Sequence, residues 1–269
     1  MRRIGLCLTG GGARGAFQAG ALKALDELGI LDRVYAVSGT SIGSVNASLF
    51  ASKSVDEIRE LWLKYSYADF NQNTSIFKTL REKKLDVVNS GIYQINLLEN
   101  LLKDNVNIEK LRQKRVYITL SPAGMENEGV TGLLKASFKH YIKNESQVIY
   151  SPIHEEKEEL ILKQILASCS IPFVFPSVRM NGQQVFDGGL YDNAPVKPLV
   201  DAGCDTIIVI HLFKLYFINK NRFPGIKFFE VKSSHSLGGT LNFDSEQVLK
   251  RYMMGYEDTM KYFTENPLK

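Results

Sequence analysis

Ser41 is a candidate nucleophile because it lies between two glycines in the segment Gly39-Thr-Ser-Ile-Gly43. This spacing is the pattern of a nucleophile elbow, a sharp strand-to-helix turn that exposes a serine able to attack an ester carbonyl. Glycines suit the turn because the backbone packs closely on both sides of it. The same residues also fit an ordinary strand-to-helix connection in which Ser41 is only a helix N-cap. The motif alone leaves both interpretations open.

A second glycine-rich segment, Gly10-Gly-Gly-Ala-Arg-Gly15, satisfies the dinucleotide fingerprint Gly-x-Gly-x-x-Gly. The alternative function is therefore a Rossmann-type dinucleotide-binding oxidoreductase that uses this loop. Such a site also needs an acidic residue at the end of the second strand, where this chain has Ser38-Gly-Thr-Ser41. The missing acidic residue disfavours a nicotinamide or flavin site.

The favoured role for this loop is an oxyanion hole beside Ser41. Backbone N–H groups at a helix N-terminus stabilise the negative oxygen of a tetrahedral intermediate by about 3 to 4 kcal/mol per well-placed donor. The predicted oxyanion-hole residues are Gly10, Gly11, Gly12, Ala13, Arg14 and Gly15. The Arg14 side chain could fix the loop by bonding carbonyls, or it could bind an anionic head group.

A nucleophilic serine needs a group that accepts its proton, and Asp187 is the favoured base. Asp187-Gly188-Gly189 ends a predicted hairpin strand, and paired glycines allow another backbone to approach closely. A carboxylate within hydrogen-bond reach of the serine can act as general base directly. His211 follows a buried strand, so a triad of Ser41, Asp187 and His211 in hydrolase order stays open as a second option.

These segments need a parallel sheet to bring them together. Ile4–Leu8 and Val34–Ser38 are predicted strands, each followed by apolar residues at helical spacing. Parallel neighbours end on the same sheet edge, so the glycine loop and Ser41 would lie side by side. The predicted fold is an α/β three-layer sandwich with a central, mostly parallel sheet flanked by helices. We expect one domain over residues 1–269, with a helical insertion at about 54–112.

The rest of the chain supplies further strands and helices. Predicted strands are Val116–Leu120, Thr206–Ile210, Ile226–Val231 and a hairpin at Val178–Phe186 that turns at Asn181-Gly182. Predicted helices are Glu155–Ala167, Pro195–Ala202 and Asp244–Phe263. Residues 121–150 carry a weaker pattern, with strands expected around Gly124 and Gly132.

Composition indicates an ordinary globular protein, with 44% hydrophobic and 23% charged residues. The net charge of +4 is too small to indicate a nucleic-acid partner. Cys7, Cys169 and Cys204 lie far apart in apolar runs without metal-ligand spacing, which predicts reduced core cysteines in a reducing compartment. The N-terminal apolar run is too short for a signal peptide, and no run reaches the length of a membrane span. We therefore expect a cytoplasmic protein.

The three motifs occur in an order that resembles the patatin-like phospholipase family. The glycine loop, the serine elbow and the Asp-Gly-Gly segment match its three signature blocks. Ala167-Ser-Cys-Ser-Ile-Pro-Phe-Val-Phe-Pro176 is similar to its proline-bearing stretch, and Asn193-Ala-Pro195 to its Asn-x-Pro tail. The resemblance runs from residue 4 to about 210, and the final helix is similar in type to that of small bacterial members. Ser121-Pro-Ala-Gly124 departs from the Thr-Asp pair of many members.

The resemblance implies a lipid acyl hydrolase with a Ser41–Asp187 dyad and no catalytic histidine. It implies neither a cofactor nor a metal requirement. Ser41 would attack the ester while Asp187 accepts its proton, with Gly39 and Gly43 shaping the elbow and Gly188 and Gly189 following the base. The substrate would be a lipid or lysophospholipid.

Such an enzyme meets its substrate at a lipid surface, and residues 213–229 are the candidate contact. Nine aromatic or large apolar residues are interleaved there with four basic ones, a composition that docks on anionic lipid. Peripheral contact with the inner face of the membrane is one interpretation of this pattern. The alternative is that these aromatic residues face the core.

Overall fold

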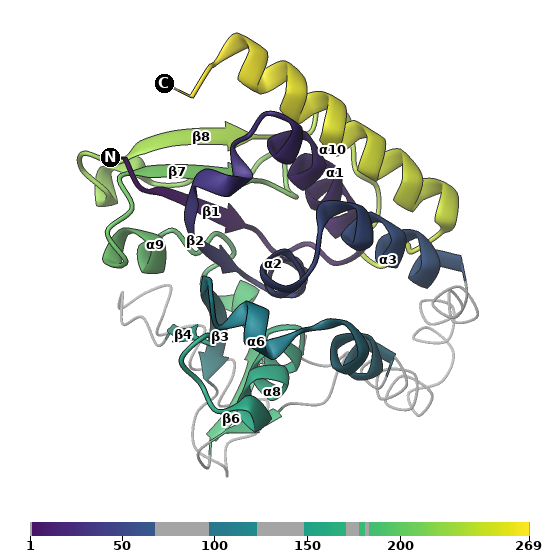
Figure 1. Ribbon diagram of the computed structural model, residues 1–269, viewed down its shortest axis with the longest axis vertical. Helices are drawn as coiled ribbons and strands as arrows, with labels where there is room; N and C mark the ends of the chain where they lie inside the picture. The colour runs from purple at the N-terminus through teal and green to yellow at the C-terminus, as the bar shows by residue number, and fades with distance from the viewer. Residues whose placement is uncertain (1, 68–96, 123–147, 171–177, 181–182, 269) are drawn as a thin grey trace.

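The computed structural model describes residues 2–67, 97–122, 148–170, 178–180 and 183–268 (Figure 1). They form one sheet whose parallel part has the strand order β3-β2-β1-β7-β8. These strands are β1 (Ile4–Leu8), β2 (Val34–Gly39), β3 (Arg115–Pro122), β7 (Thr206–Ile210) and β8 (Lys227–Val231). Antiparallel strands extend the sheet beyond β3, namely β4 (Ile149–Pro152), β5 (Val178–Met180) and β6 (Gln183–Asp187).

Helices cover both faces of this sheet. Alternate side chains of the central strands enter two hydrophobic clusters: Leu6 and Leu8 of β1 face one, and Cys7 faces the other. The first cluster is covered by α1 (Gly15–Glu27), α2 (Ile42–Ser52), α3 (Val55–Tyr67), α8 (Glu158–Ser168) and α10 (Ser245–Glu265). The second lies under α9 (Lys197–Asp201). Strands buried on both faces are typical of parallel α/β sheets, so the predicted sandwich is confirmed.

The region predicted as a helical insertion consists of helices and short connections where it is described. It comprises α3, helical residues 97–105 and α6 (Ile108–Leu111). Residues 68–96 lie outside the described part of the chain. So do the strands predicted around Gly124 and Gly132 and the turn predicted at Asn181-Gly182. Among the helices of the described ranges, none is both long and apolar enough to cross a membrane.

Two helices begin later than the sequence predicts, and one strand was not predicted. The helix expected from Glu155 begins instead at Glu158, because the amides of Glu155 and Glu156 close turns onto Pro152 and Ile153. The helix expected from Pro195 begins at Lys197, since the Pro195 carbonyl accepts a hydrogen bond from the Ser38 hydroxyl at 2.6 Å. Strand β4 was not predicted, because four residues ending in proline carry little alternation.

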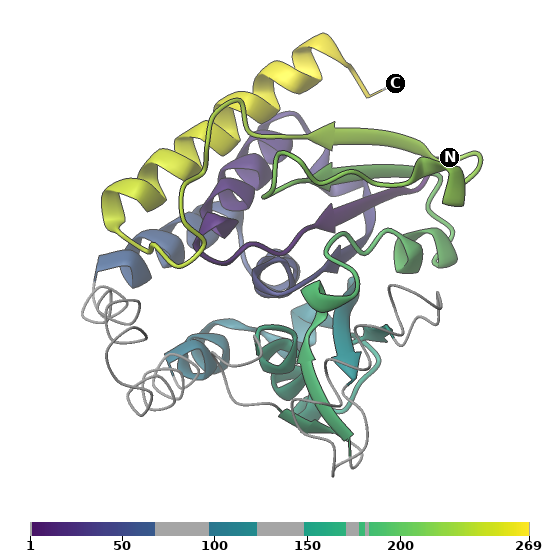
Figure 2. The same ribbon diagram turned by 180° about the vertical axis from the view of Figure 1, so that it is seen from behind.

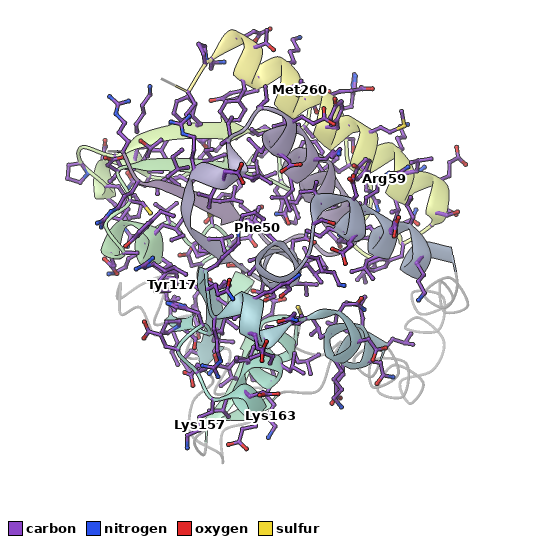
Figure 3. The ribbon with its side chains drawn as sticks, viewed as in Figure 1. Phe50, Arg59, Tyr117, Lys157, Lys163 and Met260 are labelled. Atoms are coloured by element: carbon purple, nitrogen blue, oxygen red, sulfur yellow. The ribbon has the colours of Figure 1, made fainter. Side chains whose placement is uncertain are left out.

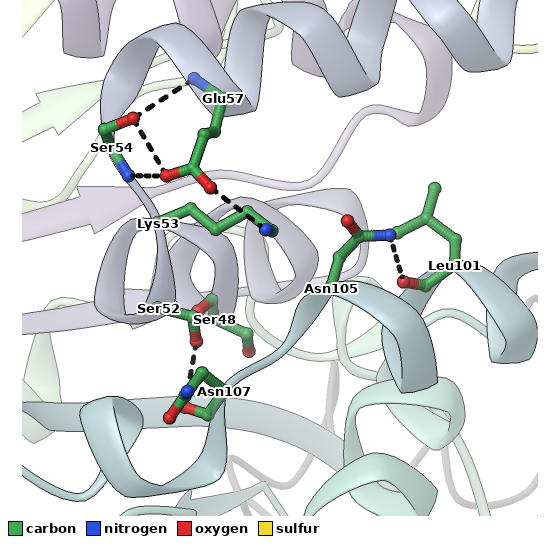
Figure 4. Close-up of polar contacts among 8 residues, drawn as sticks. All are labelled: Ser48, Ser52, Lys53, Ser54, Glu57, Leu101, Asn105 and Asn107. Carbon is green, nitrogen blue, oxygen red and sulfur yellow. Dashed lines mark hydrogen bonds and ion pairs between the residues drawn. The ribbon is translucent and has the colours of Figure 1, made fainter.

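The junction between α2 and α3 carries a reciprocal helix cap (Figure 4). The Ser54 amide donates to the Glu57 carboxylate at 2.9 Å, and the Glu57 amide donates to the Ser54 hydroxyl at 3.3 Å. The hydrogen bond from the Ser54 amide is the main reason why the pKa of Glu57 falls to about 2. On the neighbouring turn, the Ser52 hydroxyl donates to the Asn107 carbonyl at 3.3 Å, which ties α2 to the segment before α6.

Helix α10 packs directly on α1, as both views of the ribbon show (Figures 1 and 2). A Cβ added to Gly20 would overlap the Tyr252 carbonyl, and one added to Gly255 would overlap the Phe17 carbonyl. The two helices therefore touch backbone to backbone. Arg59 of α3, labelled in Figure 3, reaches toward the same helix, with its guanidinium 5.6 Å from the centroid of the Tyr252 ring.

We expect Gly255→Ala to destabilise the fold by about 3 kcal/mol, because the new methyl group meets rigid backbone that cannot repack. The measurement is the free energy of unfolding in urea. Gly29→Asn is the matched control: Gly29 has a left-handed φ of 64° with no atom near its Cβ position, and asparagine tolerates that conformation. Equal stability of the Gly255 variant and wild type would contradict the close crossing.

Candidate active site

Ser41 occupies a strained turn between β2 and α2. Its φ is 55°, and no other described residue except glycine has a positive φ. A Cβ on Gly39 would overlap the carbonyl of Gly43, and one on Gly43 would overlap the carbonyl of Leu8. Close backbone approach on both sides of the serine is therefore confirmed. Ser41 holds the N-cap position of α2, yet its side chain makes no capping hydrogen bond, which leaves the hydroxyl for another partner.

Buried serines hold this turn from behind. The Ser41 amide donates to the Ser168 hydroxyl at 3.0 Å, and that hydroxyl donates to the Thr119 carbonyl at 2.8 Å. Ser44 lies 2.8 Å from Ser168, oxygen to oxygen, and donates to the Gly39 carbonyl at 3.0 Å. A buried network with all of its members satisfied makes its surroundings rigid. It joins the elbow to β3 and α8.

The partner of the Ser41 hydroxyl is Asp187, at the end of β6. The Ser41 hydroxyl lies near enough to interact with its carboxylate, and the Gly189 amide donates to Oδ1 at 2.7 Å. Pairing of Asp187 with Leu120 brings β6 alongside β3, two strands from β1. Burial raises the pKa of Asp187 to about 6, against the opposing effect of these two interactions. The two predicted catalytic side chains are in contact.

The glycine loop reaches the same place from the end of β1. A Cβ on Gly10 would lie 3.2 Å from the Ser41 Cβ and 2.5 Å from Asn193 Oδ1. Asn193 is bonded to this glycine through two hydrogen bonds: its carbonyl accepts from the Gly10 amide at 3.3 Å, and its Nδ2 donates to the Gly10 carbonyl at 3.4 Å. A Cβ added to Gly189 would lie 3.3 Å from the same Asn193 Oδ1. Asn193 thus joins the loop to the segment after Asp187.

Protein acceptors already engage most amides of the loop. The Gly10 amide bonds Asn193, the Ala13 amide donates to the Thr240 carbonyl at 2.7 Å, and the Arg14 amide donates to the Gly11 carbonyl at 3.3 Å. The Gly15 amide donates to Gly12. Within the described ranges, the amides of Gly11 and Gly12 have no acceptor. These two donors are the ones left for a ligand.

The Arg14 side chain fixes the loop. Its Nε and Nη2 donate to the Gly238 carbonyl at 2.8 and 2.6 Å, and its Nη1 donates to the Leu212 carbonyl at 3.2 Å. The guanidinium also stacks 4.6 Å from the centroid of the Phe213 ring. Of the two roles considered from the sequence, these contacts favour the bonding of carbonyls over the binding of a head group.

A family profile described as Patatin-like phospholipase matches residues 6–200 of this chain. The chain belongs to the patatin-like phospholipase family. It is 27% identical over 218 residues to Lysophospholipase NTE1 of Cryptococcus neoformans, covering 78% of this chain and 11% of that protein. It is 24% identical over 301 residues to Triacylglycerol lipase 5 of Saccharomyces cerevisiae, covering 99% of this chain and 35% of that protein. The chain thus spans about a tenth to a third of the length of these relatives.

Two solved structures are similar in outline. VipD from Legionella pneumophila gives a TM-score of 0.49 at 14% identity, covering 98% of this chain and 67% of that chain. Human GIVD cytosolic phospholipase A2 gives 0.47 at 10% identity, covering 97% of this chain and 60% of that chain.

The contacts of the glycine loop disfavour the dinucleotide alternative in this patatin-like chain. Leu212 packs where a Gly11 side chain would project, and the Thr240 carbonyl abuts Gly12. A pyrophosphate needs that space, because the fingerprint glycines exist to let it approach the backbone. The end of β2 carries Ser41 in place of the acidic residue that would hold a ribose.

His211 lies in a different environment from Asp187. Its Nε2 is 2.9 Å from Glu230 Oε2 of β8, and Glu230 in turn pairs with Lys220 at 2.7 Å. Burial lowers the pKa of His211 to about 4, and its Nδ1 has no partner among the described residues. The interactions found for Asp187 come from Ser41 and Gly189. The contacts therefore disfavour a triad through His211.

The sequence motifs missed several polar residues that hold the site together. The Thr40 hydroxyl donates to the Thr119 hydroxyl at 2.9 Å, and Thr119 donates to the Gly39 carbonyl at 3.3 Å. Ser168 and Asn193 lie in segments that resembled the family, and that resemblance was the one available sign of a role. Thr119 sits in an apolar strand without any motif.

Of the divergent segment 121–124, Ser121 and Pro122 end β3 opposite Phe186 and Val185, and the other two residues are outside the described ranges.

We expect the rate at which a fluorophosphonate modifies Ser41 to rise with pH through about 6, because only ionised Asp187 can accept the proton. At pH 5 the rate should be about tenfold below its plateau, as one pH unit changes the ionised fraction tenfold. A raised pKa means that ionisation of Asp187 destabilises the fold as pH rises from about 4 to 6. Acid unfolding by this group therefore cannot cause the fall, and a melting curve at each pH serves as control. A flat profile from pH 5 to 8 would contradict the assignment.

Proposed function

We propose that this chain is a serine acyl-ester hydrolase for lipids, of the phospholipase A or lysophospholipase type. The observation that carries the proposal is the contact between the strained, uncapped Ser41 and the buried carboxylate of Asp187. A nucleophile bonded to a base whose pKa is tuned toward neutrality is the arrangement that acyl transfer requires. Family membership supports a lipid substrate. The names Lysophospholipase NTE1 and Triacylglycerol lipase 5 of two relatives point to the same ester class.

In the proposed mechanism, the Ser41 Oγ attacks the carbonyl carbon of the ester while Asp187 takes the hydroxyl proton. The oxygen of the tetrahedral intermediate becomes negative and is stabilised by the amides of Gly11 and Gly12. When the intermediate collapses, the C–O bond of the ester breaks and Asp187 returns its proton to the leaving alcohol. Water then attacks the acyl-enzyme with Asp187 again as base, which releases the fatty acid and restores Ser41.

Gly11 and Gly12 are the proposed oxyanion donors because their amides have no acceptor among the described residues. The other four predicted loop amides are satisfied within the protein and would have to break a bond to serve a ligand. Gly10 contributes differently, because its missing side chain lets the loop lie against the Ser41 Cβ. Two donors from a rigid loop can stabilise an oxyanion without reorganisation during the reaction.

Labelling by a fluorophosphonate tests this proposal. We expect wild type to be labelled, Ser41→Ala to be unlabelled, and Asp187→Asn to be labelled at least about a hundredfold more slowly, since a positioned base contributes that much. His211→Gln is the matched control and should label at the wild-type rate. A folded wild type that stays unlabelled would refute the hydrolase, and loss of labelling in the His211 variant would restore the triad.

We also propose that this enzyme contacts membranes peripherally through the first half of residues 213–229. Leu215 and Phe217 are 84% and 74% exposed. Lys232 lies over the Phe217 ring at 4.4 Å and donates to the Tyr216 carbonyl at 3.0 Å, so a fixed cation accompanies the exposed aromatic side chain. Large apolar side chains beside lysines favour an anionic lipid surface. The second half of the stretch differs, because Phe229 is buried against Phe263.

Sedimentation with vesicles tests the membrane contact. Wild type should bind vesicles that contain phosphatidylglycerol, and the Leu215→Ser/Phe217→Ser pair should bind at least about tenfold more weakly, since each apolar side chain contributes about 1.5 to 3 kcal/mol when buried. Leu249→Ser/Met253→Ser on α10 is the matched control, because these residues are also exposed apolar ones. Equal, negligible binding of wild type to anionic and neutral vesicles would refute the contact.

A further inference from the structure

A segment outside the family match covers the glycine loop. Residues 237–242, here called the strap, connect β8 to α10 and lie beyond residue 200, where the family match ends (Figure 2). The Thr240 carbonyl accepts the Ala13 amide at 2.7 Å and abuts Gly12 so closely that a Cβ there would overlap it. The strap therefore forms one wall of the loop that carries the proposed oxyanion donors.

One buried arginine on α10 holds the strap in place. Arg251 is 1% exposed and is the largest fully buried side chain of the described residues. Its donors reach three strap carbonyls, those of Leu237 at 2.8 Å, Gly239 at 3.0 Å and Asn242 at 2.6 Å. Its Nη1 also donates to the Ala13 carbonyl of the glycine loop at 3.2 Å. A single guanidinium thus bonds the loop and the strap at once.

Arg251 is a buried cation without an ion pair among the described residues, which is unusual for a side chain whose role is stability alone. No carboxylate in the described part of the chain forms an ion pair with it, and a buried cation is costly without one. Burial lowers the pKa of Arg251, and the positive charge of nearby Arg14 lowers it further, whereas the negative charge of Asp244 opposes both effects. The fold thus keeps two guanidinium groups close together beside the loop. Two cations repel each other, but together they create a positive potential where an oxyanion would form.

We propose that Arg251 is a positioning residue for the oxyanion hole, acting through its hydrogen bonds to Ala13 and to the strap. This proposal rests on the hydrolase function proposed for Ser41 and Asp187. Arg251 holds the Ala13 end of the loop, and the Thr240 carbonyl holds the Ala13 amide, so the preceding amides of Gly11 and Gly12 keep a fixed direction. The part of the chain beyond the family match thereby completes the catalytic machinery.

The expected kinetic effect is a lower kcat with an unchanged KM. An oxyanion contact forms only in the transition state, so a displaced loop weakens that state and leaves ground-state binding intact. Removal of one oxyanion donor costs about 10²- to 10³-fold in kcat, so a misdirected loop should cost about 10- to 100-fold. The pH profile set by Asp187 should stay where it is, because Arg251 has no hydrogen bond to the dyad.

The test measures kcat per active site on a soluble ester, with the sites counted by fluorophosphonate titration. Arg251→Met removes all four hydrogen bonds, and Arg251→Lys keeps the charge with fewer donors. Lys250→Met is the matched control, because it removes an exposed cation from the neighbouring position of the same helix. We expect the methionine variant at position 251 to lose about 10- to 100-fold in kcat per site, the lysine variant to lose less, and the control to match wild type.

A purely structural role would give a different result. Fewer molecules would then be titratable, but each titrated site would turn over at the wild-type rate, and that outcome would overturn the proposal. Gly238→Ala keeps the proposal testable if Arg251→Met does not fold. Gly238 has a φ of 70°, so alanine strains the strap without leaving an unpaired charge, and kcat per site should again fall with KM unchanged. A wild type that no fluorophosphonate labels would refute the hydrolase itself, a result distinct from normal turnover in these variants.

Discussion

The left-handed backbone of Ser41 is the constraint on which the rest of the site depends. A φ of 55° is unfavourable for serine, so this conformation persists only where contacts from the surrounding structure fix it. Two kinds of contact do so here. At Gly39 and Gly43 the neighbouring backbone lies too close for any side chain. The Ser41 amide also donates a hydrogen bond to the Ser168 hydroxyl. The strain points the hydroxyl away from capping and toward Asp187.

Buried charge is the second organising feature, and it is arranged around the strained turn. Asp187 is buried, which raises its pKa, and among the described residues its carboxylate interacts with the Ser41 hydroxyl and the Gly189 amide. On the other side of the glycine loop, Arg14 and Arg251 give their donors to backbone carbonyls. Both sets of groups cost desolvation energy that better-packed apolar residues would avoid. In the proposed reaction, negative charge would develop on an oxygen beside the glycine loop that Arg14 and Arg251 hold in place.

Much of the fold follows from local patterns. The continuously apolar segments of β1 and β7 and the helical spacing after Gly15 predict a parallel sheet covered on both faces, and the observed order confirms it. Errors arise where local signals are weak or misleading. Strand β4 is short and ends in proline, and Pro195 stays outside α9 with its carbonyl bonded to the Ser38 hydroxyl. The aromatic stretch at 213–229 contains both exposed apolar side chains, Leu215 and Phe217, and a buried one, Phe229, and composition alone cannot distinguish them.

The same division holds within the site. The glycines around Ser41 and after Asp187 specify the backbone conformation of a few neighbouring residues. The elbow, the glycine loop and the candidate base can therefore be predicted from the sequence. The hydrogen-bond partners of these motifs cannot be predicted in the same way. Ser168 lies 127 residues from Ser41, and Arg251 lies 238 residues from Ala13. Such pairs form only when sheet and helices pack, because a hydrogen bond depends on distance in space and direction. Packing also pairs four of the six loop amides with protein acceptors, and the amides of Gly11 and Gly12 have none among the described residues.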